Sequence, residues 1–291
     1  MASANPTSYR QIRSVEVDGD RVALVEANDG DSLVHLAHRD ATLTPIATLT
    51  FPAPTGFAFY VPGDPARVVG LVDGRDVSVY DVTPDGLALV DAWTGVFPSA
   101  GIHADLDGDA RPELYLDTDT SLEIVALQHD DDGRLHRTVV YTPTDSLQSQ
   151  AFGFARVDVD HDGKDELAAV FNGWRASDVR VLRRDAASER LITASREPLR
   201  GAFGLALLPG RAGPPRLVVG NFAQPDTQTL SYMSGGIHIY DLDRDPIADR
   251  QTLSLPIPSD GSIGTRFWRP QVDALDGDGL AEIINNVINP E

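Results

Sequence analysis

A ten-residue acidic pattern recurs three times in this chain, and each copy is followed by a short apolar run. The copies align without gaps at residues 105–114, 158–167 and 274–283. In the most complete copy, acidic residues occupy the first, third, fifth and ninth positions. Recurrence in register indicates a repeat protein, in which each repeat is one unit of secondary structure that packs on its neighbours. This repeat constrains the fold more than any other feature of the sequence.

Weaker copies of the same unit fill the intervals between the acidic ones. When each copy is anchored at the last residue before its apolar run, the anchors are Arg21, Arg67, Glu113, Glu166, Arg216 and Glu282. A second element recurs in phase with the first, and it is an alternating stretch that runs into an acidic turn, at 77–86, 122–133, 179–185 and 237–243. Period-two alternation bounded by Gly, Pro and Asp is typical of strands and hairpins.

Each unit therefore reads as four antiparallel strands in about 50 residues, which is the composition of a propeller blade. We predict an all-β fold, a β-propeller of six or seven four-stranded blades. It would form one domain over residues 13–291, after an N-terminal segment of residues 1–12. The last blade is incomplete, because the few residues after Glu282 provide only a second strand. Three explanations stay open: the chain continues in a longer protein, residues 1–12 close the blade, or a partner chain covers its open edge. Ser8–Val17 also reads as the inner strand of the first blade.

We name residues 105–113, 158–166 and 274–282 the first, second and third acidic loops. In the second acidic loop, Asp158, Asp160 and Asp162 would repel one another once a tight turn brings them together, so we expect a cation to neutralise them. An oxygen-only set with several carboxylates selects a hard ion, and Ca²⁺, with about 6–8 ligands, suits it best. The backbone carbonyl of Lys164 is the expected seventh-position ligand, and Glu166 closes the loop.

The pattern D-x-D-x-D-G-x-x-(D/E)-L between two strands, preceded by Phe152-Gly153, resembles the FG-GAP (VCBS-type) repeat of integrin-α-like β-propellers. A further Phe-Gly pair, Phe203-Gly204, has no acidic loop after it. The resemblance covers residues 13–291, but only three of the six units carry the acidic motif. It implies calcium-binding loops and says little about function, because propellers of this type serve adhesion, glycan binding, polysaccharide cleavage and assembly alike.

The resemblance transfers calcium ligands to the other two loops residue by residue. In the first acidic loop Ala110 replaces the turn glycine, and the implied ligands are Asp105, Asp107, Asp109, Glu113 and the backbone carbonyl of Arg111. In the third acidic loop Ala274 occupies the first ligand position, and the implied ligands are Asp276, Asp278, Glu282 and the backbone carbonyl of Leu280. We therefore expect two to three bound Ca²⁺ ions with a mainly structural role.

Composition limits the partners that this chain can have. A formal net charge of -20 and a pI near 4.5 argue against nucleic acid, which requires a basic face. No apolar run approaches the roughly 18 residues of a membrane span, so we expect no membrane insertion. Calcium loops of this kind bind with a Kd of about 10⁻⁴–10⁻³ M, which favours an extracellular or periplasmic location. The chain begins without a secretory signal, so a cytoplasmic location stays open.

No catalytic signature stands out in the sequence, which has no nucleophile elbow, zinc-protease motif or phosphate loop. Aromatic and basic residues at expected loop ends are candidates for ligand contact, and they are Trp174, Arg175 and Trp268. We predict a noncatalytic, calcium-stabilised binding module for a protein or glycan partner. Two alternatives stay open: a polysaccharide lyase or hydrolase with its site at the channel mouth, and a propeller subunit of a larger assembly.

Overall fold

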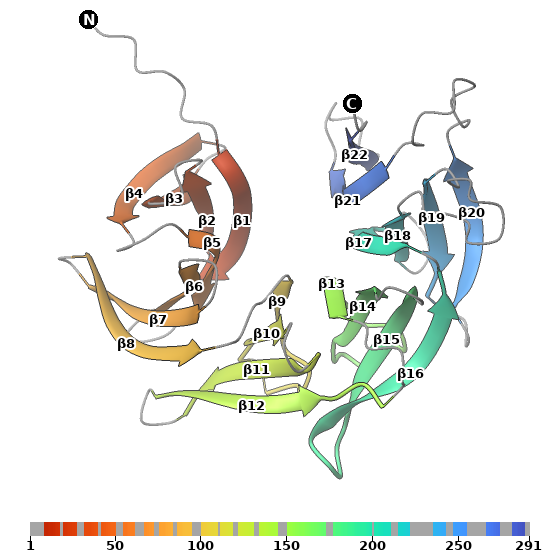
Figure 1. Ribbon diagram of the computed structural model, residues 1–291, viewed down its shortest axis with the longest axis horizontal. Helices are drawn as coiled ribbons and strands as arrows, with labels where there is room; N and C mark the ends of the chain where they lie inside the picture. The colour runs from red at the N-terminus through yellow and green to blue at the C-terminus, as the bar shows by residue number, and fades with distance from the viewer. Residues whose placement is uncertain are drawn as a thin grey trace, which may run out of the picture. The chain divides into compact units, whose positions relative to one another are not determined.

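The structure is a computed structural model, and it describes the strands and some of their connections. The described residues are 9–17, 20–27, 32–39, 42–50, 55–61, 67–72, 76–83, 86–94, 100–109, 111–118, 122–130, 134–144, 150–172, 177–199, 201–210, 215–221, 235–242, 247–254, 266–273 and 281–288. Within these ranges every regular element is a β-strand (Figure 1). The prediction of an all-β chain is therefore confirmed for the described residues.

Among the described residues, five four-stranded antiparallel sheets follow one another along the chain, and in each of them sequence neighbours pair in order. The first contains β1 (Tyr9–Val17), β2 (Asp20–Ala27), β3 (Ser32–Arg39) and β4 (Thr42–Thr50). The second contains β5 (Thr55–Val61), β6 (Arg67–Val72), β7 (Asp76–Thr83) and β8 (Gly86–Thr94). The third contains β9 (Gly101–Ala104), β10 (Glu113–Asp117), β11 (Ile124–His129) and β12 (Leu135–Tyr141).

The fourth sheet contains β13 (Gln150–Val157), β14 (Glu166–Asn172), β15 (Ser177–Asp185) and β16 (Arg190–Pro198). The fifth contains β17 (Ala202–Leu208), β18 (Arg216–Asn221), β19 (Gly236–Asp241) and β20 (Ala248–Ser254). A sixth sheet has two strands among the described residues, β21 (Arg266–Asp273) and β22 (Glu282–Ile288). The prediction of four-stranded units with an incomplete last one is confirmed for the described residues.

The predicted anchors coincide with the starts of the second strands. Five of these strands begin at the anchor itself, namely β6 at Arg67, β10 at Glu113, β14 at Glu166, β18 at Arg216 and β22 at Glu282. In the first sheet β2 begins at Asp20, one residue before the anchor Arg21. The sequence also suggested that Ser8–Val17 forms the inner strand of the first blade. In the structure β1 covers Tyr9–Val17 and pairs with β2, as that interpretation predicts.

The chain divides into two compact units. The first comprises Met1–Pro98 with Thr118–Thr120 and Gln128–His136, and so contains the first two sheets. The second comprises Ser99–Asp117, Ser121–Leu127 and Arg137–Glu291. Both acidic loops described below lie in the second unit. A single domain over residues 13–291 stays a prediction.

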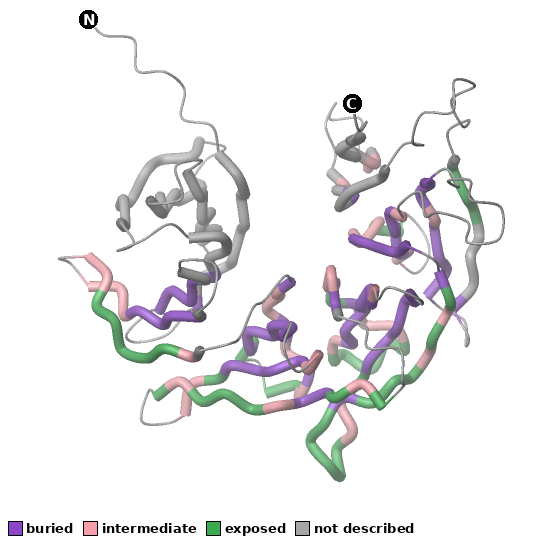
Figure 2. The backbone as a smooth tube through the Cα atoms, in the orientation of Figure 1, coloured by how far each residue is buried: buried purple, intermediate pink, exposed green. Residues whose placement is uncertain are grey.

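The fourth sheet shows why a blade buries both of its faces. Strand β14 is buried along nearly its whole length (Figure 2), and its side chains alternate between two cores. Leu167, Ala169 and Phe171 join the core that includes residues of the third sheet. Ala168 and Val170 join the core that includes residues of the fifth sheet. Alternation across the pleat delivers apolar side chains to both faces, so the sequence of β14 reads as a continuous apolar run.

A bulge recurs near the start of the inner strands. The register shifts between Thr55 and Phe57 in β5, between Ala151 and Gly153 in β13, and between Ala202 and Gly204 in β17. A bulge inserts one extra residue into a strand and bends it locally. Period-two alternation does not predict this irregularity, and its recurrence in separate sheets supports the repeat.

The extra residue of the bulge in β13 and in β17 is the Phe of a Phe-Gly pair. The rings of Phe152 and Phe203 lie against each other, with centroids 4.7 Å apart. A Cβ at Gly153 would lie only 3.3 Å from the backbone nitrogen of Leu205. Glycine therefore permits the close approach of these two inner strands.

In the part of the chain that the structure describes, no helix has the length and hydropathy needed to cross a membrane.

Candidate metal centre

The first acidic loop connects β9 to β10, and its carboxylates hold its own backbone. Asp105 Oδ1 accepts hydrogen bonds from the backbone N–H groups of Gly108 (2.7 Å) and Asp109 (3.1 Å). Asp107 Oδ1 accepts from the N–H of Asp109 at 3.1 Å, and Asp109 Oδ1 accepts from that of Arg111 at 2.8 Å. These Asp turns bring the side chains at alternate positions to the inside of one tight loop.

The second acidic loop connects β13 to β14 in a related way. Asp158 Oδ2 accepts from the N–H of Gly163 at 3.1 Å, and Asp160 Oδ1 accepts from that of Asp162 at 3.2 Å. Asp162 Oδ1 accepts from the N–H of Lys164 at 2.8 Å. The two loops thus share the hydrogen bonds from position five to position three and from position seven to position five.

Backbone conformation explains the residue types at the turn positions. Gly163 has φ +87°, as the sharp turn predicted from its glycine requires. The fourth position of both loops is also left-handed, with φ +79° at Gly108 and +60° at His161. A non-glycine residue in this region is strained by about 1–2 kcal/mol. His161 therefore sits in a turn whose conformation the loop imposes on it.

Carboxylate oxygens converge in each of the two loops. One oxygen from each of Asp105, Asp107 and Asp109 lies within 4.8 Å of the other two, and the same holds for Asp158, Asp160 and Glu166. Asp158 Oδ1 is buried and has no hydrogen-bond partner among the described residues. An unsatisfied buried carboxylate oxygen is costly unless a cation or proton meets it. The donor set therefore fits a hard divalent cation in the second acidic loop.

Glu113 closes the first acidic loop from the start of β10, where it is almost fully buried. Tyr115 donates its hydroxyl hydrogen to Glu113 Oε2 at 2.8 Å. Burial raises the pKa of Glu113 to about 7; the hydrogen bond from Tyr115 opposes this rise, and the negative charges of Asp107 and Asp109 add to it. Burial and the Glu113 carboxylate also raise the pKa of Tyr115, so its hydroxyl stays protonated.

Glu166 closes the second acidic loop in the corresponding position, and it too is buried. Its Oε2 accepts a hydrogen bond from the backbone N–H of Val159 at 2.7 Å. Burial raises the pKa of Glu166, the bond from Val159 opposes the rise, and the neighbouring aspartates contribute in the same direction as burial. Both loops therefore concentrate negative charge that a bound cation would relieve.

The two acidic loops also contact each other. The backbone N–H of Asp165 donates to the carbonyl of Asp105 at 3.4 Å. Arg184, on β15, donates from Nη1 to Asp107 Oδ2 at 2.6 Å. A Cβ at Gly108 would lie 3.1 Å from Cε of Lys164, so the lysine side chain lies beside the first loop.

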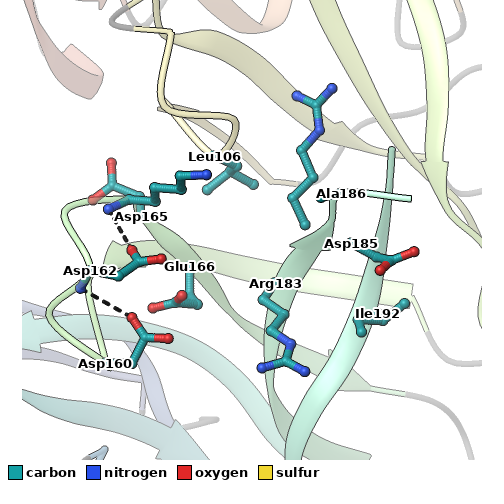
Figure 3. Close-up of a pocket in the computed structure, with 11 residues that line it drawn as sticks. Leu106, Asp160, Asp162, Asp165, Glu166, Arg183, Asp185, Ala186 and Ile192 are labelled. Atoms are coloured by element: carbon teal, nitrogen blue, oxygen red, sulfur yellow. Dashed lines mark hydrogen bonds between the residues drawn. The ribbon is translucent and has the colours of Figure 1, made fainter. Parts of the chain in front are cut away.

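A cavity of about 240 Å³ opens beside the second acidic loop. Figure 3 shows Asp160, Asp162 and Glu166 toward one side of it, and Arg183, Asp185 and Ile192 toward the other. A second cavity of about 500 Å³ shares Asp160, Glu166 and Arg183 with the first, and extends to the apolar side chains of Leu242 and Ile247. Space for a small group therefore adjoins the carboxylates, which permits a cation there to keep water ligands.

The structure leaves part of the predicted site untested. Asp276, Asp278 and Leu280 of the third acidic loop lie outside the described residues, as do Trp174 and Arg175. Glu282 begins β22 and Trp268 lies in β21, and the description of both is limited to the backbone. Metal ligation by the backbone carbonyls of Arg111 and Lys164 stays a prediction.

Sequence reasoning missed two side chains that shape the first acidic loop. Tyr115 lies two residues after Glu113, and nothing in the sequence distinguishes it from other residues of the predicted strand. Arg184 is 77 residues from Asp107, and no local spacing connects the two. Only packing of the third and fourth sheets brings Arg184 to this loop.

Comparison with known proteins adds information on the fold. No family model matches the chain, and no curated protein matches it. Among solved structures, the N-terminal domain of Nup159 aligns with 96% of this chain and 73% of that chain, at 13% identity and a TM-score of 0.49. A protein from Lactobacillus plantarum aligns with 81% of this chain and 69% of that chain, at 18% identity and a TM-score of 0.49.

The WD40 domain of coronin from Toxoplasma gondii aligns with 92% of this chain, at 9% identity and a TM-score of 0.53. This chain spans 64% of the length of that structure. At such low identity the likeness concerns the fold alone. Together with the succession of four-stranded antiparallel sheets, it identifies the sheets as blades and the fold as a β-propeller.

Proposed function

We propose that this chain is a noncatalytic, calcium-stabilised β-propeller module that binds a protein partner. The observation that carries the proposal is the convergence of three carboxylates in each of two neighbouring loops. Asp158 Oδ1 in the second loop supports it, since this oxygen is buried and unsatisfied among the described residues. Solvated Asp turns account for the hydrogen bonds within each loop, but they do not require carboxylates to be packed together at the cost of mutual repulsion.

Calcium would supply charge neutralisation and a bridge between strands. In the second acidic loop Asp158, Asp160 and Glu166 would hold it, with Asp162 within the same turn. Because Asp158 follows β13 and Glu166 begins β14, one ion would tie the inner strand of the blade to its second strand. A ligand that binds only the folded state stabilises it by mass action.

We further propose that the repeats are of the FG-GAP type. The acidic loop occupies the connection between the inner and second strands in the third and fourth blades, as that resemblance implies. The Phe-Gly pairs of β13 and β17 support the assignment, because their Phe rings and Gly backbones lie against each other. The close approach of adjacent inner strands provides a physical reason for a repeated Phe-Gly.

A protein partner is favoured by exposed apolar side chains on outer strands in each of the two units. They are Leu89 and Val90 on β8 of the first unit, and, separately, Ile192 on β16 and Leu253 on β20 of the second unit. A glycan site at Trp174, Arg175 or Trp268 stays a prediction. If calcium is bound at the millimolar level expected of extracellular modules, the module works outside the cell or in a periplasm.

Calorimetric titration with CaCl₂ tests the calcium part of the proposal. The chelator-treated protein should release or absorb heat in the millimolar range, and CaCl₂ should raise the melting temperature above its value in EDTA. Asp160→Asn should remove one binding event, because it removes a charged ligand from the second acidic loop. Glu189→Gln, in the exposed β15–β16 turn, is the matched control and should bind like the unaltered chain.

A negative result in these calcium experiments would contradict the proposal. If titration gives no heat and the melting temperature is the same in CaCl₂ and EDTA, the acidic loops are solvated turns and the proposal is wrong. For the partner, a glycan array and an affinity capture performed with and without chelator separate the two ligand classes. Glycan binding without protein capture would overturn the choice of a protein partner.

A further inference from the structure

We propose that Arg184 acts as an internal counter-cation for the first acidic loop, so that the two loops fill with calcium in order. The second acidic loop would bind first, and the first would bind only when Ca²⁺ displaces the guanidinium from Asp107. This inference rests on the calcium binding proposed above, and it adds a regulatory side chain that no local motif predicts.

The contact between Arg184 and Asp107 joins two neighbouring blades. Arg184 Nη1 lies 2.6 Å from Asp107 Oδ2, and both side chains are mostly buried, with 26% and 19% of their surface exposed. A charge-assisted hydrogen bond of this length, shielded from water, is stronger than an exposed ion pair. Asp107 is also one of the three aspartates whose oxygens converge in the first loop.

The two loops differ in which carboxylate oxygens are already engaged. In the first loop both oxygens of Asp107 are used, Oδ1 by the N–H of Asp109 and Oδ2 by Arg184. In the second loop Asp158 Oδ1 is buried without a partner among the described residues. The ion pairs found in the described part of the chain include none to Asp158, Asp160 or Glu166.

These differences set the order of binding. A cation entering the second loop finds repelling carboxylates that no side-chain cation of the described residues neutralises. A cation entering the first loop must compete with a guanidinium that already neutralises part of the charge. Because displacement adds an unfavourable step, the apparent affinity of the first loop should be lower than its ligand set alone would provide.

A calcium titration of charge-neutral variants tests this competition. The parent for comparison carries Asp160→Asn and Asp276→Asn, so that the remaining heat reports the first acidic loop. On this parent, Arg184→Met removes the charge and retains the length of the side chain. Arg190→Met is the matched control, because it removes an exposed arginine that lines neither cavity and whose Nη2 donates to Thr142 Oγ1.

We expect Arg184→Met to lower the Kd of the remaining site by about tenfold, which is the effect of losing one charge-assisted hydrogen bond. Arg190→Met should leave that Kd unchanged. In EDTA, Arg184→Met should also lower the melting temperature, and CaCl₂ should restore it. If the doubly substituted parent does not fold, the same comparison is made on the chain that carries Asp276→Asn alone, where Arg184→Met should merge the two remaining binding phases into one.

An unchanged Kd in Arg184→Met would overturn the inference. So would a loss of melting temperature that is equal in EDTA and in CaCl₂, because that result indicates a purely structural ion pair. Failure of the underlying proposal looks different, since the chain with all its acidic loops intact would then give no calcium heat. That outcome overturns both the calcium proposal and the order of filling.

Discussion

Replacing Glu113 with glutamine should stabilise the calcium-free protein at alkaline pH, although it removes an implied calcium ligand. The buried carboxyl has a pKa raised from 4.5 to about 7, and a shift of this size corresponds to about 3.5 kcal/mol at about 1.4 kcal/mol per pH unit. Above pH 7 the folded protein must keep this group ionised beside Asp107 and Asp109. The substituted amide would carry no charge, and its oxygen could still accept the hydrogen bond from Tyr115.

The direction of the pH dependence follows from proton linkage. Because the pKa of Glu113 is higher in the folded than in the unfolded state, the folded state binds more protons between pH 4.5 and about 7. The free energy of unfolding therefore falls as pH rises through this window. With calcium present, the bound cation should favour the ionised carboxylate and remove this decline.

Urea denaturation followed by far-UV circular dichroism at pH 5, 6, 7 and 8 measures the effect. In EDTA at pH 8 we expect Glu113→Gln to be more stable than the unaltered chain by about 3 kcal/mol, and at pH 5 the difference should fall below about 1 kcal/mol. In saturating CaCl₂ the order at pH 8 should reverse, because an amide is a weaker calcium ligand than a carboxylate. Glu189→Gln, on an exposed turn, should show none of these differences. Parallel pH curves for Glu113→Gln and the unaltered chain in EDTA would refute the reasoning.

Two further pairs of variants test the loop turn and the core by urea denaturation. Gly163 has φ +87° and an added Cβ would meet nothing within 4 Å, so Gly163→Ala should lose about 1–2 kcal/mol from backbone strain alone. His161→Gly, at φ +60°, should stay within about 1 kcal/mol of the unaltered chain, and a large loss would show that the imidazole matters. Phe171 is fully buried, with the Tyr141 ring centroid 5.8 Å from its own and the Arg180 guanidinium 4.3 Å from its centroid. Phe171→Ala should cost about 3–5 kcal/mol, whereas Leu89→Ala, 61% exposed, should change stability by less than about 0.5 kcal/mol.

Local pattern was sufficient for the strand plan of this protein. Arg67, Glu113, Glu166, Arg216 and Glu282 could be placed at strand starts because each follows a turn-forming stretch and precedes an apolar run. The incomplete sixth unit followed from the same count. The bulges at Phe152 and Phe203 were not predicted, since an extra residue in a strand depends on how the inner strands approach each other.

In the acidic loops, too, some features follow from local sequence and others depend on tertiary contacts. The spacing of Asp158, Asp160 and Glu166 within nine residues determines that a tight turn brings their oxygens together, because the forces involved act between near neighbours. The partners that distinguish one loop from the other come from elsewhere in the chain. Arg184 reaches Asp107 only because two sheets pack face to face. The pKa of Glu113 is raised chiefly because burial removes the carboxyl from water, and the charges of Asp107 and Asp109 add to that effect. Sequence therefore determined the repeat, the strands and the acidic turns. Tertiary structure decided how each carboxylate is neutralised, because burial and long-range charge pairing depend on contacts that no local spacing encodes.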